Sequence, residues 1–379
     1  QPVKPGLTHD TLLEKATVLK TCKRILGPLL FLAALSSVAA ELPPELQELG
    51  LRESPVASRD MPGWEKPERI LVYTLFGPQI IDVLQSAAPA VELVPVKTAE
   101  EAALAIPDAQ AVIGLCDQTM FDNADQLHWV QMYLAGVDNC VSLPGMQEGP
   151  ILTNGQRLSS PTIGDHAIAL TYALVRGIDI SHGNQVNGVW ARSSADTLRG
   201  FGELSGRTML VVGLGGIGTQ VAKRANALGM RVLATRGSRR EGPDYVEYVG
   251  LAPEAIELAT QADVVVNAAP LTCTTRGMFI KAFFEAMIPK AYFINVGRGE
   301  SAVTADLIEA LQNGAIAGAG LDVTDPEPLP ADHPLWTAPR VLITPHVAAL
   351  SMETFGRIQA LVAENLRRYV AGEPLLSVV

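Results

Sequence analysis

Three polar residues with acid–base or anion-binding chemistry each follow an apolar segment in the second half of the chain: Arg298, Glu327 and His346. These apolar segments are residues 291–295, 318–322 and 341–344. A guanidinium can hold a carboxylate, and an imidazole beside a carboxylate can donate or accept a proton near neutral pH. Each residue taken alone is more often an ordinary turn or loop residue. Together, we interpret them as candidate catalytic residues.

A glycine-rich segment upstream of these residues predicts a dinucleotide-binding turn. Residues 213–218 read Gly-Leu-Gly-Gly-Ile-Gly, between an expected strand at 209–212 and an expected helix at 219–228. In a G-x-G-x-x-G turn, the glycines allow a tight turn, close approach of the backbone to a pyrophosphate, and helix–strand packing. The pyrophosphate then meets free amides at the helix N-terminus. The predicted cofactor-binding residues here are Gly213, Gly215, Gly216, Ile217 and Gly218.

The residues after the next expected strand, 231–235, bear on the choice between NAD and NADP. An NAD site usually has a carboxylate there, which accepts from the ribose 2′-hydroxyl. This chain instead has Arg236, Ser238 and Arg239, and the first carboxylate is Glu241. Because guanidinium forms charge-assisted pairs with phosphate, we predict NADP, with NAD as the alternative. A solvated basic loop is the competing interpretation.

The elements that must position these residues alternate between short apolar strands and helices, which predicts an α/β, doubly wound fold with parallel sheets. In the first half we expect strands at 70–73, 91–94 and 111–114, and helices at 78–88 and 99–105. Longer helices are expected at 160–176 and 352–369. We divide the chain into residues 1–67, 68–155, 156–348 and 349–379, and we expect 41–67 to be a loosely structured linker.

In its order of motifs, the chain resembles the D-isomer-specific 2-hydroxyacid dehydrogenase family over roughly residues 68–375, and within it the glyoxylate/hydroxypyruvate reductase branch. The matching motifs are residues 135–139, 213–218, 270–272 with Thr275, 295–299, 321–328, 334–336 and 344–346. Two segments depart from the family pattern. Residues 115–119 contain no Arg, and Thr304 stands where the family has an acidic residue.

The resemblance implies an NAD(P)-dependent oxidoreductase that transfers hydride to or from a small 2-oxo or 2-hydroxy acid. It assigns catalysis to Arg298, Glu327 and His346, and substrate binding to Ala135, Gly136 and Arg298. It adds cofactor contacts at Pro270, Thr275 and Asp322. It also implies a Rossmann coenzyme domain inserted into a flavodoxin-like substrate domain, with the active site between them, and a homodimer supported by the long helix near residue 160.

Two other functions are compatible with these motifs. Transcriptional corepressors of the same fold sense a dinucleotide without turnover, and formate- or phosphite-type dehydrogenases use the same fold on other anions. The chain has 29 basic and 40 acidic residues, a net charge of −11. This balance argues against general binding of nucleic acid or of an anionic membrane.

The four cysteines are Cys22, Cys116, Cys140 and Cys273. They form no CxxC pair and no His lies at metal-ligand spacing, so we expect no metal site and no disulfide framework, but buried free thiols.

The N-terminal residues predict a secretory signal peptide. Lys20, Lys23 and Arg24 precede an apolar segment at 25–40 that ends in small residues. This pattern is typical of a cleaved signal, and the segment is shorter than the about 20 apolar residues that span a bilayer. We therefore expect an exported protein without a stable membrane span after cleavage. An ordinary buried helix, with the protein in the cytoplasm, is the alternative.

Overall fold

The computed structural model describes residues 41–147, 149–191 and 201–379. The predicted signal segment and Cys22 lie outside these residues. Within the described residues, no helix is long and apolar enough to cross a membrane.

The larger of the two parallel sheets has seven strands in the order β13-β12-β11-β10-β7-β8-β9. Its strands are β7 (Thr208–Val212), β8 (Arg231–Arg236), β9 (Tyr248–Leu251), β10 (Val264–Asn267), β11 (Tyr292–Asn295), β12 (Gly318–Leu321) and β13 (Val341–Ile343). The order from β9 to β12 is that of a Rossmann fold, in which the chain reverses direction of strand addition between β7 and β10. This is the switch point at which such sheets bind dinucleotides.

The smaller parallel sheet has five strands in the order β3-β2-β4-β5-β6. Its strands are β2 (Arg69–Tyr73), β3 (Glu92–Val96), β4 (Ala111–Ile113), β5 (Trp129–Gln131) and β6 (Ile151–Thr153). This is the flavodoxin-like order. The predicted α/β fold with two doubly wound parallel sheets is confirmed.

Helices follow most strands, as the doubly wound pattern requires. The α-helices up to residue 186 are α1 (Pro44–Gln47), α2 (Ile80–Ala87), α3 (Ala99–Ala105), α4 (Gln118–Phe121), α5 (Asp138–Val141), α6 (Pro144–Gln147), α7 (Ser160–Val175) and α8 (Ile178–Val186). The later ones are α10 (Gly216–Ala227), α11 (Ala255–Ala259), α12 (Lys281–Ala286), α13 (Thr304–Gln312) and α14 (Met352–Ala371). Short 3-10 helices are η1 (Ser58–Asp60), η2 (Ala252–Glu254), η3 (Gly299–Ser301) and η4 (Pro334–Thr337).

Two apolar clusters cover the seven-stranded sheet. One contains four phenylalanines whose neighbouring rings pack edge to face or tilted: Phe279, Phe283, Phe284 and Phe293. The other packs α7 and α10 against strands of the sheet. The loops at the strand ends therefore project from a sheet whose central strands β7, β10, β11 and β12 are buried along their whole length.

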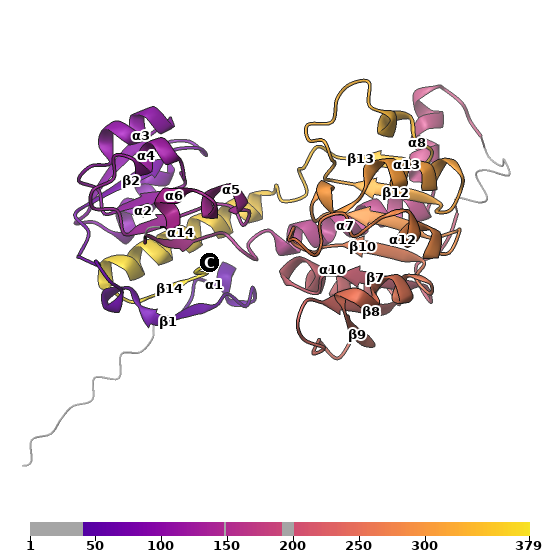
Figure 1. The fold of residues 1–379 in the computed structure, drawn as a ribbon, viewed down its shortest axis with the longest axis horizontal. Coiled ribbons are helices and arrows are strands. Elements are labelled where there is room, and N and C mark those ends of the chain that lie inside the picture. The colour runs from indigo at the N-terminus through magenta and orange to yellow at the C-terminus, as the bar shows by residue number, and fades with distance from the viewer. Residues whose placement is uncertain (1–40, 148, 192–200) are drawn as a thin grey trace, which may run out of the picture. The chain divides into compact units, whose positions relative to one another are not determined.

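The last helix of the chain belongs to the core of the five-stranded sheet. Ile358, Leu361 and Leu366 of α14 pack in the same apolar cluster as Ile70 and Val72 of β2. Figure 1 shows α14, in yellow, among the elements of this sheet, although it follows the seven-stranded sheet in the chain.

The segment before the first sheet is ordered structure. β1 (Glu53–Ala57) pairs antiparallel with β14 (Pro374–Leu376), and Leu46 of α1 is fully buried in the core that contains α14. Our expectation of a loosely structured linker at 41–67 was therefore wrong for this part of the chain. The strand that pairs with β1 lies more than 300 residues away in the sequence (Glu53 is opposite Leu376), so no local sequence pattern predicts this pairing.

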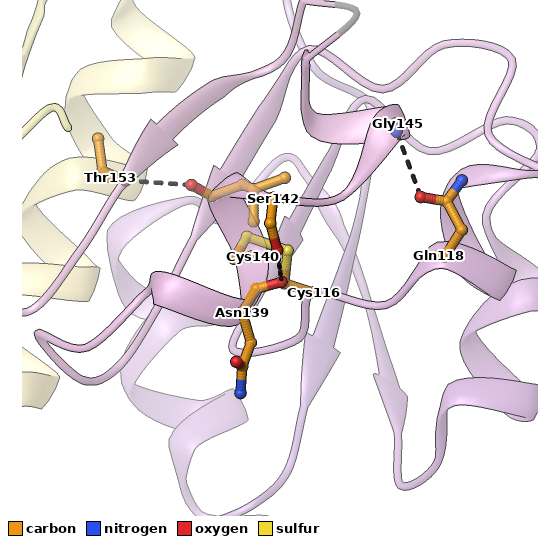
Figure 2. Close-up of a disulfide and its surroundings, with 8 residues drawn as sticks. Cys116, Gln118, Asn139, Cys140, Ser142, Gly145 and Thr153 are labelled. Atoms are coloured by element: carbon orange, nitrogen blue, oxygen red, sulfur yellow. Dashed lines mark hydrogen bonds between the residues drawn. A yellow bond between two sulfur atoms is a disulfide. The ribbon is translucent and has the colours of Figure 1, made fainter. Parts of the chain in front are cut away.

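The cysteine prediction was also wrong. Cys116 and Cys140 form a disulfide across 24 residues, and Cys273 is an exposed free thiol rather than a buried one. Figure 2 shows this bond between the segment after β4 and the short helix α5. Nearby, the Gly145 amide donates to the Gln118 side chain at 3.3 Å. Two segments at the carboxyl ends of β4 and β5 are thus covalently joined.

Candidate active site

The ends of three adjacent strands place the predicted catalytic residues along one sheet edge. The last residues of β11, β12 and β13 are in register, with Asn295 opposite Leu321 and Leu321 opposite Ile343. Neighbouring strands lie about 4.8 Å apart, so segments that leave these ends begin close together. Arg298, Glu327 and His346 are on those three segments.

Glu327 and His346 form a direct pair. The His346 Nδ1 lies 2.5 Å from the Glu327 Oε1, and the two side chains are 47% and 40% exposed. Since an ionised carboxylate only accepts, Nδ1 carries the proton and donates to Glu327. The other ring nitrogen, Nε2, is left to exchange a proton with a ligand.

The backbone of His346 is held in a conformation that side-chain-bearing residues seldom adopt. Its φ is 54°, and its amide donates to the Asp322 carbonyl at 2.8 Å. The buried Asp322 carboxylate accepts three further hydrogen bonds, from the Thr344 hydroxyl and from the amides of Val347 and Ala348. Backbone outliers that are fixed in this way concentrate at functional sites. Asp322 therefore anchors the histidine loop, and its predicted contact with the nicotinamide stays a prediction.

Arg298 is fixed by a second buried hydrogen-bond network. Its carbonyl accepts from the Asn295 amide group at 3.0 Å and from the Ser301 hydroxyl at 2.6 Å, and Asn267 donates to both Asn295 and Ser301. Its guanidinium lies 3.5 Å from the Asp138 carboxylate. Within the described residues, no hydrogen bond joins Arg298 to Glu327 or His346.

The two predicted substrate-binding residues differ in their contacts. Gly136 lies against Arg298, because a Cβ built there would be 3.0 Å from its Nη2. The carbonyl of Ala135 accepts from the Asn154 side chain at 2.8 Å. The structure thus brings Gly136 and Arg298 together, and the hydrogen bond from Asn154 to Ala135 holds the segment that contains Gly136.

The glycine loop has the geometry that its spacing predicts. Gly213 has φ 96°, and a Cβ there would lie 2.7 Å from the Ala269 backbone. A Cβ at Gly218 would lie 2.1 Å from the Gly213 carbonyl oxygen, so helix α10 approaches the strand closely. A Cβ at Gly215 would meet nothing within 4 Å, which leaves backbone open to a ligand. This combination fits the pyrophosphate of a dinucleotide.

The arginines at and after the end of β8 are not equivalent. Arg240 pairs with Glu254 at 2.7 Å and with the Tyr248 hydroxyl, and the bond from Arg240 is the main reason why the pKa of Glu254 falls to about 2. In contrast, Arg236 and Arg239 form no ion pair within the described residues, and the buried Nε of Arg236 has no hydrogen-bond partner there. An anion is the natural partner for such unpaired donors.

The segment after β10 closes into a compact turn. The Thr275 hydroxyl donates to the Pro270 carbonyl at 2.6 Å and accepts from the Thr272 amide at 2.8 Å. Pro270 and Thr275 therefore lie together beyond the carboxyl end of β10, next to the switch point.

Sequence reasoning missed three residues that support the site. His166 on α7 bonds the Thr344 hydroxyl at 2.9 Å, Asn154 holds the Ala135 carbonyl, and Arg157 lies against the glycine loop. None belongs to a motif with fixed spacing, so no sequence signal identified them. Within the described residues, no cluster of His, Cys, Asp or Glu could hold a metal ion.

Comparison with known proteins agrees with this geometry. The profile of the "D-isomer specific 2-hydroxyacid dehydrogenase, NAD binding domain" matches residues 168–348. A glyoxylate reductase of Korarchaeum cryptofilum is 34% identical over 273 residues, which are 71% of this chain and 82% of the relative. A glyoxylate reductase of Pyrococcus furiosus is also 34% identical, over 68% of this chain and 77% of the relative.

Solved structures give the same result. A D-isomer specific 2-hydroxyacid dehydrogenase family protein from Aeromonas salmonicida superposes with a TM-score of 0.73 at 28% identity, covering 82% of this chain and 98% of that one. An NADPH-dependent glyoxylate/hydroxypyruvate reductase from Sinorhizobium meliloti has a TM-score of 0.70 at 27% identity, with coverage of 82% and 98%. The chain therefore belongs to the D-isomer specific 2-hydroxyacid dehydrogenase family, whose members are NAD(P)-dependent oxidoreductases of 2-hydroxy acids.

Proposed function

We propose that this chain reduces a small 2-oxo acid of the glyoxylate or hydroxypyruvate type, with NADPH as the preferred cofactor. The main support for this reaction is the hydrogen-bonded pair of Glu327 and His346. Glu327 follows β12, which pairs with β11, the strand that precedes Arg298. The names of the relatives support the substrate class, since the two archaeal proteins are glyoxylate reductases.

The residues of the chain fit the charges that develop in such a reduction. When bound, the dinucleotide supplies hydride to the carbonyl carbon. His346 donates a proton through Nε2 to the carbonyl oxygen, because Nδ1 is engaged by Glu327. Glu327 accepts the hydrogen bond from Nδ1 and thereby fixes the plane of the imidazole. Arg298, beside Gly136, holds the substrate carboxylate through its guanidinium.

The NADPH preference is supported by the unpaired arginines after β8. Within the described residues, Arg236, the last residue of β8, and Arg239 form no ion pair, and the buried Nε of Arg236 has no hydrogen-bond partner. The preceding residue, Thr235, is buried and carries no carboxylate. Arg236→Asp with Arg239→Ala should shift the preference from NADPH toward NADH by at least 10-fold, since a charge-assisted bond contributes about 1.5–3 kcal/mol. Arg240→Gln is the matched control, because that guanidinium already pairs with Glu254. An unchanged cofactor ratio in the double variant would refute the NADPH site.

A panel of glyoxylate, hydroxypyruvate and longer 2-oxo acids, each with NADPH and NADH, tests the activity. We expect the fastest oxidation of NADPH with the two small acids. Tight cofactor binding without turnover of any acid would favour a dinucleotide sensor. Reduction of the cofactor by formate or phosphite would favour that type of dehydrogenase.

We also propose a homodimer and export from the cytoplasm. The homodimer is supported by exposed apolar side chains that follow α7: Ile178, Val186, Val189 and Trp190, which is 93% exposed. Light scattering of the wild type and of the Trp190→Ser variant tests the homodimer: a monomeric wild type would contradict it, and an unchanged dimer in the variant would contradict the role of this surface.

Export is supported by the Cys116–Cys140 disulfide, since disulfides persist mainly in oxidising compartments. An exported NADP enzyme would need to leave the cytoplasm with its cofactor bound. Mass spectrometry of the mature N-terminus tests export, and an intact residue 1 in native protein would contradict it.

A further inference from the structure

We propose that Arg157, which lies outside the glycine-loop unit, is a further cofactor-binding residue that holds the 2′-phosphate together with Arg236 and Arg239. This inference rests on the NADPH preference proposed above. It assigns a specificity-determining role to a residue in the segment that precedes α7.

The backbone of Arg157 is the first observation. Its φ is 71°, in the left-handed region that disfavours residues with a side chain. Its carbonyl accepts from the Ser160 amide at 3.1 Å, which fixes it against the first turn of α7. Outliers held in place by their surroundings point toward function.

The second observation is where the side chain lies. A Cβ built on Gly216 would be 3.1 Å from the Arg157 Cγ and 2.7 Å from the Ser160 hydroxyl. Gly216 is a freely variable position of the G-x-G-x-x-G pattern and the first residue of α10. The stem of Arg157 therefore takes the space that a side chain at 216 would fill, at a helix N-terminus that favours anions.

The third observation is the charge around this arginine. Burial lowers the pKa of Arg157, and so do the positive charges of Arg52 and Arg239. Burial also lowers the pKa of Arg236, and Arg239 and Arg157 add to this effect against the opposing Glu241. Arg157 is thus an electrostatic neighbour of both residues of the proposed 2′-phosphate site.

Glu241 offsets part of this positive charge but forms no ion pair with these arginines in the part of the chain that the structure describes. Within the described residues, neither Arg52, Arg157, Arg236 nor Arg239 forms an ion pair, whereas Arg240 pairs with Glu254. Among the same described residues, the guanidinium of Arg157 makes one hydrogen bond, from Nη1 to the Leu49 carbonyl at 3.2 Å, which leaves most of its five donors for a ligand. A dianionic phosphate at this place would relieve the repulsion between the guanidiniums.

Calorimetry can test this without turnover. The ligands are NADPH, NADH, adenosine 2′,5′-bisphosphate and adenosine 5′-monophosphate, measured on the wild type, Arg157→Gly, Arg157→Lys and the control Arg240→Gln. Gly is chosen because it tolerates the left-handed backbone. We expect Arg157→Gly to weaken NADPH and the bisphosphate at least 10-fold and to leave NADH and the monophosphate within twofold. Lys should restore part of the loss, and Arg240→Gln should bind as the wild type does.

Other outcomes separate the two proposals. Equal weakening of both dinucleotides by Arg157→Gly would place the residue at the pyrophosphate or in the scaffold and overturn the inference. Normal NADPH binding by this variant, with a loss in the Arg236→Asp and Arg239→Ala variant, would overturn the inference and keep the NADPH preference. A wild type that does not distinguish NADPH from NADH would overturn both.

Discussion

The two sheets hold their functional loops by different means. In the seven-stranded sheet, the segments that carry Arg298 and His346 are tied to buried side chains, Asn295 and Asp322, by hydrogen bonds. In the five-stranded sheet, the segment after β5 is exposed at Ala135, Gly136 and Asp138, and the Cys116–Cys140 disulfide joins it to the half-buried segment after β4. The comparison indicates that a sheet with buried central strands can orient candidate catalytic groups through buried polar side chains at the strand ends, whereas an exposed loop is restrained by a covalent bond.

The largest effect should come from the hydrogen-bonded side of this comparison. His346→Ala removes the proton donor, so we expect kcat to fall by about 10²–10⁴-fold while the cofactor Kd stays within twofold. Steady-state kinetics and fluorescence titration of NADPH measure the two quantities. His182→Ala, on exposed α8, is the control. Turnover near the wild-type rate in the His346 variant would reject its role.

The next effect concerns the covalent side. The Cys116–Cys140 disulfide closes a loop whose ends are 24 residues apart in the sequence. Replacing both cysteines by Ser opens this loop, and we expect the free energy of unfolding to drop by about 3 kcal/mol. We also expect KM for the 2-oxo acid to rise more than kcat falls, because the substrate loop loses its restraint. Urea unfolding and initial rates measure these changes, with Cys273→Ser as the matched control. Equal stability of the double variant and the control would show that the disulfide does not restrain this region.

The smallest effect sharpens the comparison within the seven-stranded sheet. Asp322→Asn keeps the shape of the side chain but replaces one acceptor oxygen by an NH2 group. This new donor would face the Thr344 hydroxyl or a backbone amide, which are themselves donors, so at least one hydrogen bond is lost. We expect the free energy of unfolding to fall by about 1–2 kcal/mol and kcat to fall with it. Asp165→Asn, an exposed partner of Arg224, serves as the control in thermal and kinetic assays. Wild-type stability and rate in Asp322→Asn would mean that the histidine loop needs no such anchor.

Local patterns were sufficient for the long elements. The strand at 231–235 and the helix at 99–105 were predicted nearly to the residue, because apolar spacing and flanking turn residues define them. β5 and β6 have three residues each, of which one is polar, and they were missed, whereas the equally short β4 and β13 are entirely apolar and were predicted.

Features that depend on distant pairing were beyond sequence reasoning. Nothing near Cys116 points to Cys140, and nothing near Glu53 points to Leu376. The site shows the same division. His346 and Arg298 were predicted as site residues because motifs mark them, whereas Arg157 became a candidate only through its φ and its approach to Gly216.

The pairing of β1 with β14, and the packing of α14 in the core of the five-stranded sheet, have a consequence for synthesis on the ribosome. The sheet that begins first, at residue 69, cannot complete its core until residues 352–376 have emerged. The sheet that begins later has all its strands by residue 343. Maturation of the two halves should therefore run opposite to their order of translation, and the first half needs protection from aggregation while it waits for the last helix.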